Sequence, residues 1–114
     1  MPAEPMTYSR RPGNREGVEV LSLAGPFTLS NMFQLQRDLG DLHPAYLIFD
    51  IAKVPYMDSA ALGLLVNFYV SAQKNGRRMA IAGATPRVLT LFEMTRLDGL
   101  LRLYPSVAEA ESAE

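Results

Sequence analysis

The first third of the chain carries two hydrophobic patterns that predict strands followed by a helix. Val18–Leu23 mixes apolar residues with Glu19 and Ser22, which is typical of a half-buried strand. A weaker candidate strand at Met6–Arg11 precedes it, and the Pro12-Gly13-Asn14 segment between them favours a turn. We therefore expect an N-terminal β-hairpin. Residues 1–5 are expected to form a flexible tail, and residues 6–114 a single domain.

A helical stripe follows the hairpin. Apolar residues recur three or four positions apart, and polar residues occupy the positions between them, which is typical of an amphipathic helix. The residues of this stripe are Met32, Leu35, Leu39 and Leu42. Ser30 is the expected N-cap, because its hydroxyl can accept a backbone N–H bond, and Pro44 is expected to end the region.

Two continuous apolar segments dominate the middle of the chain. Tyr46–Phe49 predicts a central strand that is covered on both faces. Ala60–Ala72 predicts a helix that is apolar nearly all round, and Asn75-Gly76 is a suitable C-terminal cap for it. A helix of this kind is either deeply buried or keeps one face for a partner.

The last third of the chain predicts two strands and two helices. Met79–Ala82 and Leu100–Leu103 are the candidate strands, and a helix begins between them at Thr85-Pro86. Ser106 and Glu109 form a capping-box pattern for a final helix, whose residues from about 110 are expected to fray. The order predicts an α/β fold, with a mixed central sheet, an N-terminal hairpin and about four helices packed on it.

Composition excludes several classes of protein. The 114 residues include 11 basic and 12 acidic side chains and no cysteine. Disulfides, thiolate zinc sites and cysteine nucleophiles are therefore excluded. A net charge of -1 argues against a nucleic-acid partner. Because no apolar stretch is long enough for a signal segment or a membrane span, we expect a cytoplasmic protein without membrane insertion.

Candidate catalytic chemistry is sparse. His43 is the single histidine, and its place beside Pro44 predicts an exposed loop residue. No phosphate-binding glycine loop and no cluster of metal ligands is present, so we expect no cofactor, no metal and no enzymatic activity. Asp50 follows an apolar strand, as the phosphorylated aspartate of a receiver domain does, but the acidic pair that such a domain needs is missing. Asp50 is therefore expected to cap the strand end.

The Asp58-Ser59 pair stands directly before the most apolar helix. Either side chain can cap that helix, and a hydroxyl at this position is also exposed and available for modification. A serine in a strand-to-helix turn is similar to a hydrolase nucleophile elbow, which needs small residues two positions to either side. Met57 and Ala61 occupy those positions, so a small serine hydrolase is only a remote alternative.

Two motifs together resemble the bacterial anti-sigma factor antagonists of the STAS family. Tyr56-Met57-Asp58-Ser59-x-x-Leu62-Gly63 resembles the phosphorylation motif of that family. Leu91-Phe92-Glu93-Met94-Thr95-x-Leu97 resembles its later Leu-Phe-Asp-Met-Ser/Thr-Gly-Leu segment. The resemblance extends over about Met6 to Pro105 and agrees with the predicted order of elements.

The resemblance implies a partner-switching protein. The unphosphorylated form would bind an anti-sigma factor that is also a serine kinase, and would thereby free the sigma factor. Phosphorylation at Ser59 would release the partner, and a serine phosphatase would reset the switch. The implied partner-binding residues lie in two segments of the chain: Thr28, Met57, Asp58, Ser59, Ala60, Ala61, Leu62 and Gly63.

Four positions depart from the family pattern. Ala61 replaces a glycine, Ala60 replaces a hydroxyl residue, and Arg96 replaces the glycine before Leu97. Thr28 replaces an aspartate that the family places near the phosphorylated serine. The alternative within the family is therefore a constitutive scaffold or accessory subunit, in a stress-sensing complex or a lipid transporter.

Overall fold

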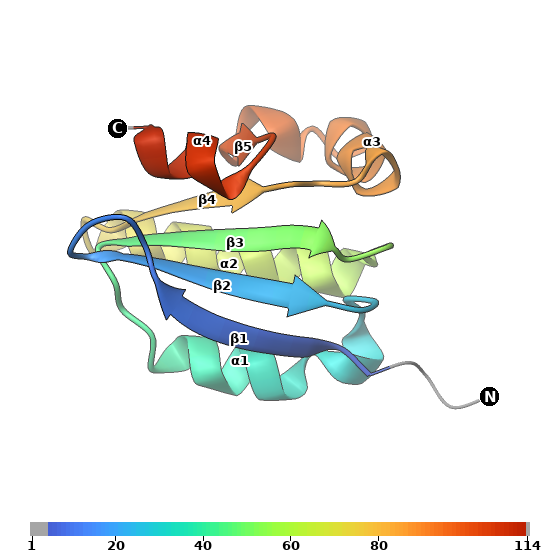
Figure 1. Ribbon diagram of the computed structural model, residues 1–114. Coiled ribbons are helices and arrows are strands. Elements are labelled where there is room, and N and C mark those ends of the chain that lie inside the picture. Colours follow the sequence, from blue (N-terminus) through green and yellow to red (C-terminus); the bar gives the residue numbers. More distant parts are fainter. Residues whose placement is uncertain (1–4, 114) are drawn as a thin grey trace.

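The computed structural model describes residues 5–113, which form one mixed sheet with helices on both of its faces (Figure 1). The strand order is β1-β2-β3-β4-β5. The first two strands pair antiparallel, as the predicted hairpin requires, and the remaining neighbours pair parallel. The strands are β1 (Thr7–Pro12), β2 (Val18–Ala24), β3 (Tyr46–Lys53), β4 (Arg78–Ala82) and β5 (Leu103–Tyr104).

Three α-helices and two 3₁₀ turns connect the strands of the described part of the chain, and a fourth helix follows the last strand, which confirms the predicted α/β fold. The helices are α1 (Phe33–Gly40), α2 (Ser59–Lys74), α3 (Pro86–Met94) and α4 (Val107–Ser112). The 3₁₀ turns are η1 (Leu29–Asn31) and η2 (Leu97–Gly99). Residues 1–4 of the expected tail and the last residue, 114, lie outside the described residues. No helix within residues 5–113 is long and apolar enough to span a membrane.

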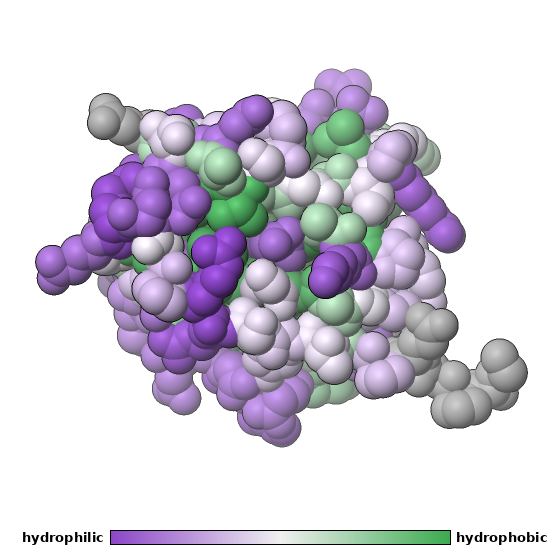
Figure 2. Space-filling view, in the orientation of Figure 1, coloured by the Kyte–Doolittle hydropathy of each residue, from purple (hydrophilic) through white to green (hydrophobic). Residues whose placement is uncertain are grey.

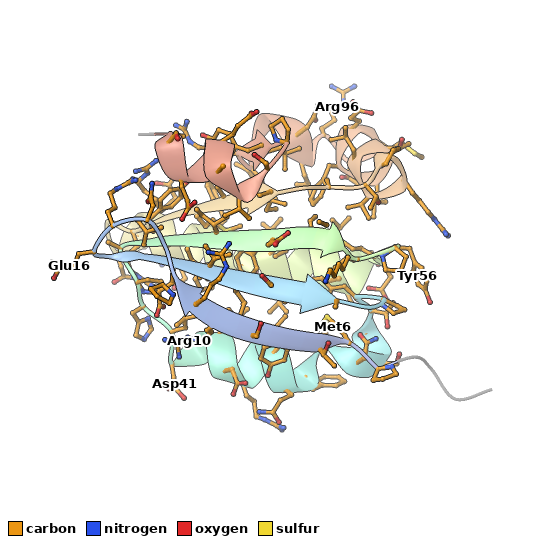
Figure 3. All side chains as sticks on the ribbon, in the orientation of Figure 1. Met6, Arg10, Glu16, Asp41, Tyr56 and Arg96 are labelled. Carbon is orange, nitrogen blue, oxygen red and sulfur yellow. The ribbon has the colours of Figure 1, made fainter. Side chains whose placement is uncertain are left out.

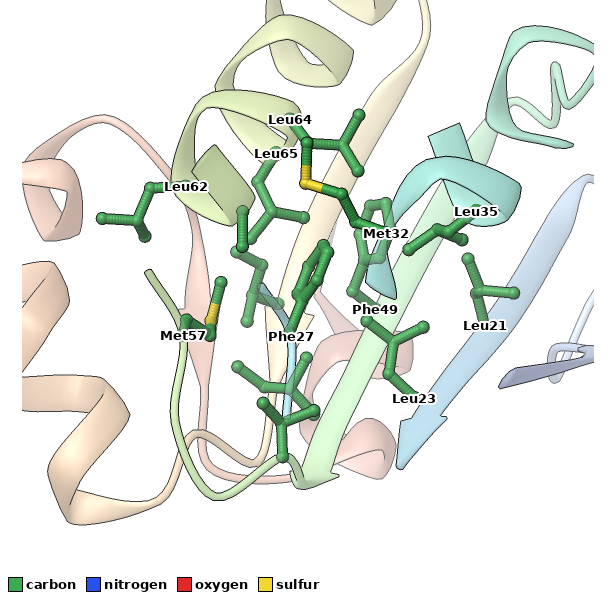
Figure 4. Close-up of a cluster of buried hydrophobic side chains, with 14 of the residues drawn as sticks. Leu21, Leu23, Phe27, Met32, Leu35, Phe49, Met57, Leu62, Leu64 and Leu65 are labelled. Carbon is green, nitrogen blue, oxygen red and sulfur yellow. The ribbon is translucent and has the colours of Figure 1, made fainter. Parts of the chain in front are cut away.

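The central strand β3 separates two apolar layers. Leu47, Phe49 and Ile51 point to one face and join the larger core with α1, α2 and α3 (Figure 4). Tyr46 and Ile48 point to the other face, where α4 contributes Ala110. Because both faces are covered, β3 has a nearly continuous apolar sequence, as predicted.

The first helix differs from the prediction at both ends. Ser30 is not its N-cap, because the Asn31 side chain accepts a bond from the Thr28 N–H at 2.9 Å and the chain forms η1 there instead. The helix then starts at Phe33 and ends at Gly40. Leu42 is buried as predicted, but it lies beyond the helix.

The last strand is also shorter than predicted. The structure forms η2 over Leu97–Gly99, and pairing with β4 begins only at Leu103. Leu101 is buried in the larger core, so its apolar character reflects packing rather than strand pairing. Fraying from about residue 110 stays a prediction; α4 extends to Ser112, and the Tyr46 hydroxyl donates to the Ala110 carbonyl at 2.8 Å.

Arg96 has a left-handed backbone conformation. Its φ is 62° and its ψ is 20°, which makes it the one non-glycine residue with positive φ among residues 5–113. A side chain in this conformation costs roughly 1–2 kcal/mol because Cβ approaches the following carbonyl. The resemblance placed a family glycine at this position, and the backbone explains that preference.

We expect Arg96→Gly to raise the free energy of unfolding by about 0.5–1 kcal/mol. The substitution relieves the left-handed strain, and part of the gain is offset by the larger backbone entropy of glycine in the unfolded chain. Urea unfolding followed by circular dichroism measures the change. Arg96→Ala is the matched control, because it removes the same charge but keeps Cβ, and it should bring no gain. An equal gain in both variants would mean that the charge matters and the backbone does not.

Candidate functional site

The site forms where the chain leaves β2 and where it leaves β3. The Phe27 N–H donates to the Tyr56 carbonyl at 3.1 Å, and the Asp58 N–H donates to the Phe27 carbonyl at 3.3 Å. These two bonds make a short parallel bridge between Phe27 and Met57, whose side chains are both buried (Figure 4). The segment that carries Thr28 therefore lies against the segment that leads to Ser59.

Gly25 allows β2 to end in this way. Its φ is +100°, and a Cβ on this residue would lie 2.5 Å from the Pro5 carbonyl oxygen. Only glycine satisfies both the conformation and the space. The chain then continues through Pro26 and Phe27 to the bridge with Met57.

Asp58 joins the two segments through both of its carboxylate oxygens. One oxygen, Oδ1, accepts the Ala61 N–H at 3.0 Å and caps the N-terminus of α2. The other, Oδ2, accepts the Leu29 N–H at 2.9 Å at the start of η1. Of the two residues that the sequence allowed as the cap, Asp58 therefore has this role, and the Ser59 hydroxyl is not needed for it.

Ser59 is the first residue of α2, and it is exposed. Its hydroxyl makes no hydrogen bond to any other residue within 5–113, so it faces solvent at a helix N-terminus that Asp58 holds in place. Such a hydroxyl is accessible to a modifying enzyme and is not needed for the local fold.

The other predicted partner-binding residues divide into two groups. Thr28 and Ala60 are partly exposed and Gly63 is exposed, so all three lie at the surface around Ser59. Met57, Ala61 and Leu62 are buried in the larger core. These three residues hold the surface in position and offer a partner little area of their own.

Four exposed apolar side chains lie on the segments near Ser59, and the sequence did not identify them as partner-binding residues. Leu29 and Phe33 are each 53% exposed on the side of η1 and α1. Tyr56 and Met94 are 39% and 77% exposed on the side of α3. Figure 3 shows Tyr56 projecting at the end of the sheet opposite Glu16. In the sequence, the one available sign was that the apolar Tyr56 stands beside the polar Asp58-Ser59 pair. Helical periodicity does not show that such a side chain is exposed.

A hollow of about 270 Å³ lies between the Tyr56 segment and α3. Its wall is mainly apolar, and Arg87 contributes the one charge, with its guanidinium carbon 5.1 Å from the centre of the Tyr56 ring. We call the exposed side chains of Leu29, Phe33, Tyr56 and Met94 the apolar rim. The hollow is a recess in this rim that a side chain of a partner could enter.

The remaining candidate residues lie apart from Ser59. His43 is exposed, as predicted, in the loop before β3, whereas Ser59 follows the opposite end of that strand. An eight-residue strand is about 26 Å long, so His43 is too distant to activate Ser59 as a nucleophile. Asp50 does not cap the strand end as expected, because β3 continues to Lys53. It lies within the strand, where its carboxylate accepts the Ala52 N–H at 3.1 Å and the Ser22 hydroxyl at 3.4 Å. Within residues 5–113 no cluster of histidine and carboxylate side chains could hold a metal ion.

Comparison with known proteins shows which family the chain belongs to. The model of the STAS domain family matches residues 13–110. The chain belongs to the STAS domain family. The fold agrees with this assignment: the crystal structure of an anti-sigma factor antagonist from Mycobacterium paratuberculosis superposes with a TM-score of 0.84, at 23% identity, over 94% of this chain and 92% of that one.

Two further STAS relatives indicate the range of roles in the family. The anti-sigma-B factor antagonist of Listeria monocytogenes is 32% identical over 57 residues, which span 50% of this chain and 50% of that protein. The chain thus matches about half the length of this curated relative. The STAS domain of a SulP transporter from Vibrio cholerae is 28% identical, with a TM-score of 0.65 over 83% of this chain and 77% of that one.

We expect Asp58→Ala to lower the free energy of unfolding by about 1–3 kcal/mol. The variant loses an N-cap, worth roughly 0.5–2 kcal/mol, and a second bond that joins η1 to α2. Asp58→Asn should lower the free energy of unfolding by less, because asparagine is also a good N-cap. Some loss remains, since its amide NH₂ group would face the Leu29 N–H and could not accept a bond from it. Chemical denaturation of the three proteins measures the order.

Asp98→Ala is the matched control for this substitution. Asp98 is exposed in η2, and its side chain makes no hydrogen bond or ion pair to any other residue within 5–113. Its removal should change the stability by less than about 0.5 kcal/mol. If Asp58→Ala is as mild as Asp98→Ala, the junction at Asp58 does not hold the site together.

Proposed function

We propose that this STAS domain is an anti-sigma factor antagonist that acts by partner switching. The unphosphorylated form binds an anti-sigma factor with serine kinase activity and thereby frees the sigma factor. Phosphorylation at Ser59 releases that partner, and a serine phosphatase restores the binding form. The observation that carries this proposal is the free, exposed hydroxyl of Ser59 at a rigid helix start inside an apolar rim.

The shape of the site supports protein binding. The surface is formed by Thr28, Asp58, Ser59, Ala60 and Gly63, none of which is fully buried. Leu29, Phe33, Tyr56 and Met94 add exposed apolar area on the neighbouring segments, and Tyr56 also contacts Arg87. Exposed apolar side chains beside small polar residues support a contact with another protein, because exposed apolar area marks interaction sites.

The charge of a phosphate supports release of the partner. Phosphoserine adds about 1.5–2 negative charges next to the Asp58 carboxylate. At roughly 6 Å and an effective dielectric of 20–80, their repulsion is about 1–5 kcal/mol, whereas the helix N-terminus returns only about 0.3–1 kcal/mol. A partner that covers the site would also have to desolvate the phosphate. Because both charges belong to this chain, their repulsion lowers the affinity only as far as burial by the partner strengthens it, and desolvation of the phosphate beside Asp58 carries the release. Each 1.4 kcal/mol of that cost is a factor of about ten in affinity.

Thr28 changes the electrostatics of the switch. Its hydroxyl lies 3.0 Å from the Ser30 hydroxyl, so neutral groups stand where the family resemblance places an aspartate. The phosphate would then face one neighbouring carboxylate, that of Asp58, and the kinase would contact a neutral surface beside it. Partner switching in this protein therefore depends more on desolvation of the phosphate and less on repulsion.

An accessory subunit of a transporter is the second candidate function. The likeness to the SulP transporter domain of Vibrio cholerae favours it, because a STAS fold serves there as part of a transporter. In that case the apolar rim would be permanently covered, and Ser59 would not regulate binding.

Substitution of Ser59 tests the switch. The partner is first captured from a native lysate on the wild-type protein, identified by mass spectrometry and purified. Its affinity is then measured by calorimetry. We expect Ser59→Ala to bind as the wild type does, and Ser59→Asp to bind at least tenfold more weakly, because the added carboxylate is placed beside Asp58.

Ser71→Asp is the control for added charge. Ser71 is exposed on the same helix, three turns away from Ser59, and its substitution should leave the affinity unchanged. Equal affinities for Ser59→Ala and Ser59→Asp would remove Ser59 from the mechanism. Identification of the captured partner as a transporter ATPase would replace the proposed function with the second candidate.

A further inference from the structure

One positive charge stands without a counter-ion in the hollow between the Tyr56 segment and α3. Arg87 is exposed in the first turn of α3, and its side chain makes no hydrogen bond or ion pair to any other residue within 5–113. No acidic residue lines the hollow. The guanidinium group of Arg87 is therefore available to an anionic group from outside the domain.

The residues around Arg87 do not supply a carboxylate. Thr90 and Leu91 occupy the positions three and four residues further along α3, where an ion-paired side chain of the same helix would stand. The Tyr56 segment continues to Asp58, but both carboxylate oxygens of Asp58 already accept backbone N–H bonds. The charge on Arg87 is therefore not balanced within this part of the fold.

The helix dipole makes this position a poor one for a cation. A helix N-terminus carries a partial positive charge, so acidic side chains are stabilising in the first turn and basic ones are not. Arg87 is the second residue of α3, and the first turn of α3 has no acidic residue. The stability of the fold does not explain this arginine, and an external carboxylate would be attracted by both the guanidinium group and the helix N-terminus.

Tyr56 holds the guanidinium group at the hollow. The guanidinium carbon of Arg87 lies 5.1 Å from the centre of the Tyr56 ring, which is a cation–π contact. This contact leaves N–H donors of the group for a carboxylate, which guanidinium groups bind in a paired geometry. Tyrosine and arginine are also the residue types that often dominate the binding energy of protein interfaces, where they line pockets that the partner fills.

The rest of the wall is mainly apolar. Met57, Val88, Leu91 and Met94 line the hollow beside Tyr56, and the flexible thioether of Met94 can adapt to a partner. Figure 2 shows hydrophobic and hydrophilic side chains next to one another over α3, at the upper right of the view. The volume of about 270 Å³ lies below the range of about 300–1,000 Å³ that is typical of small-molecule sites. It suits a side chain that projects from a protein.

We propose that this hollow recognises an acidic side chain next to an apolar one on the anti-sigma factor partner. The carboxylate binds Arg87, and the apolar side chain enters between Tyr56 and α3. This contact rests on the proposed function, because it assigns a specificity to the same partner. Met57 lines the hollow and directly precedes the Asp58-Ser59 pair, so one partner surface can cover both. A basic side chain at the same place would be repelled, which selects among partners.

Carbodiimide coupling of an Arg87→Lys variant tests the contact. The reagent joins a lysine amine to a carboxylate where the two lie in contact. The probe is the purified partner of the Ser59 experiment, mixed with the unphosphorylated variant. We expect mass spectrometry to find a cross-link from position 87 to an acidic residue of the partner that has an apolar neighbour. The wild type, whose lysines are Lys53 and Lys74, should give no cross-link at position 87.

Calorimetry with the same purified partner gives the affinities. Arg87→Gln should bind at least tenfold more weakly than the wild type, and its affinity should depend less on salt because an ion pair is lost. Arg11→Gln is the matched control. Arg11 is exposed near the start of β2, at the end of the sheet away from Ser59, and its side chain makes no hydrogen bond or ion pair to any other residue within 5–113. This control should keep the wild-type affinity.

Three results would overturn the contact. These are equal affinities of Arg87→Gln and the wild type, equal weakening in Arg87→Gln and Arg11→Gln, or a cross-link from position 87 to a second copy of this chain instead of the partner. Failure of the phosphorylation switch has a different signature: Ser59→Asp then binds as Ser59→Ala does, while Arg87→Gln still binds more weakly.

Discussion

The burial of β3 on both faces is the constraint on which the rest of the structure depends. Because β3 pairs parallel with β2 and β4, each neighbour must be reached by a crossover, and α2 spans the whole length of the sheet to return to β4. That crossover places Ser59 at one end of the sheet and Lys74, the last residue of α2, at the other.

At the Ser59 end, the residue that holds the local structure stands next to the residue whose hydroxyl is unused by the fold. Asp58 uses both carboxylate oxygens to join η1 to α2, so it cannot be altered without loosening the surface. The side chain of Ser59 makes no hydrogen bond to any other residue within 5–113, so its hydroxyl can be modified without loss of a bond that holds the helix. A switch needs this separation, because a modified residue that also capped the helix would couple signalling to stability.

Most of the fold was predictable because periodicity reports burial. The apolar run of β3, the Thr85 cap of α3 and the hairpin before Gly25 were all read correctly from local pattern. The start of α1 was not, because the Asn31 side chain competes with the helix in a way that spacing does not reveal. Asp58 was recognised as a possible cap, but its second bond to Leu29 joins segments distant in sequence. The exposure of Met94 likewise depends on tertiary packing.

The central claim is that Ser59 carries a phosphate in the cell and that this phosphate controls binding. The most direct measurement is phosphopeptide mass spectrometry of the protein isolated from its native cells, with the partner-bound and free fractions analysed separately. We expect phosphate on Ser59 in the free fraction and unmodified Ser59 in the bound fraction. Unmodified Ser59 in both fractions, or equal phosphorylation of Ser59 in both, would contradict it.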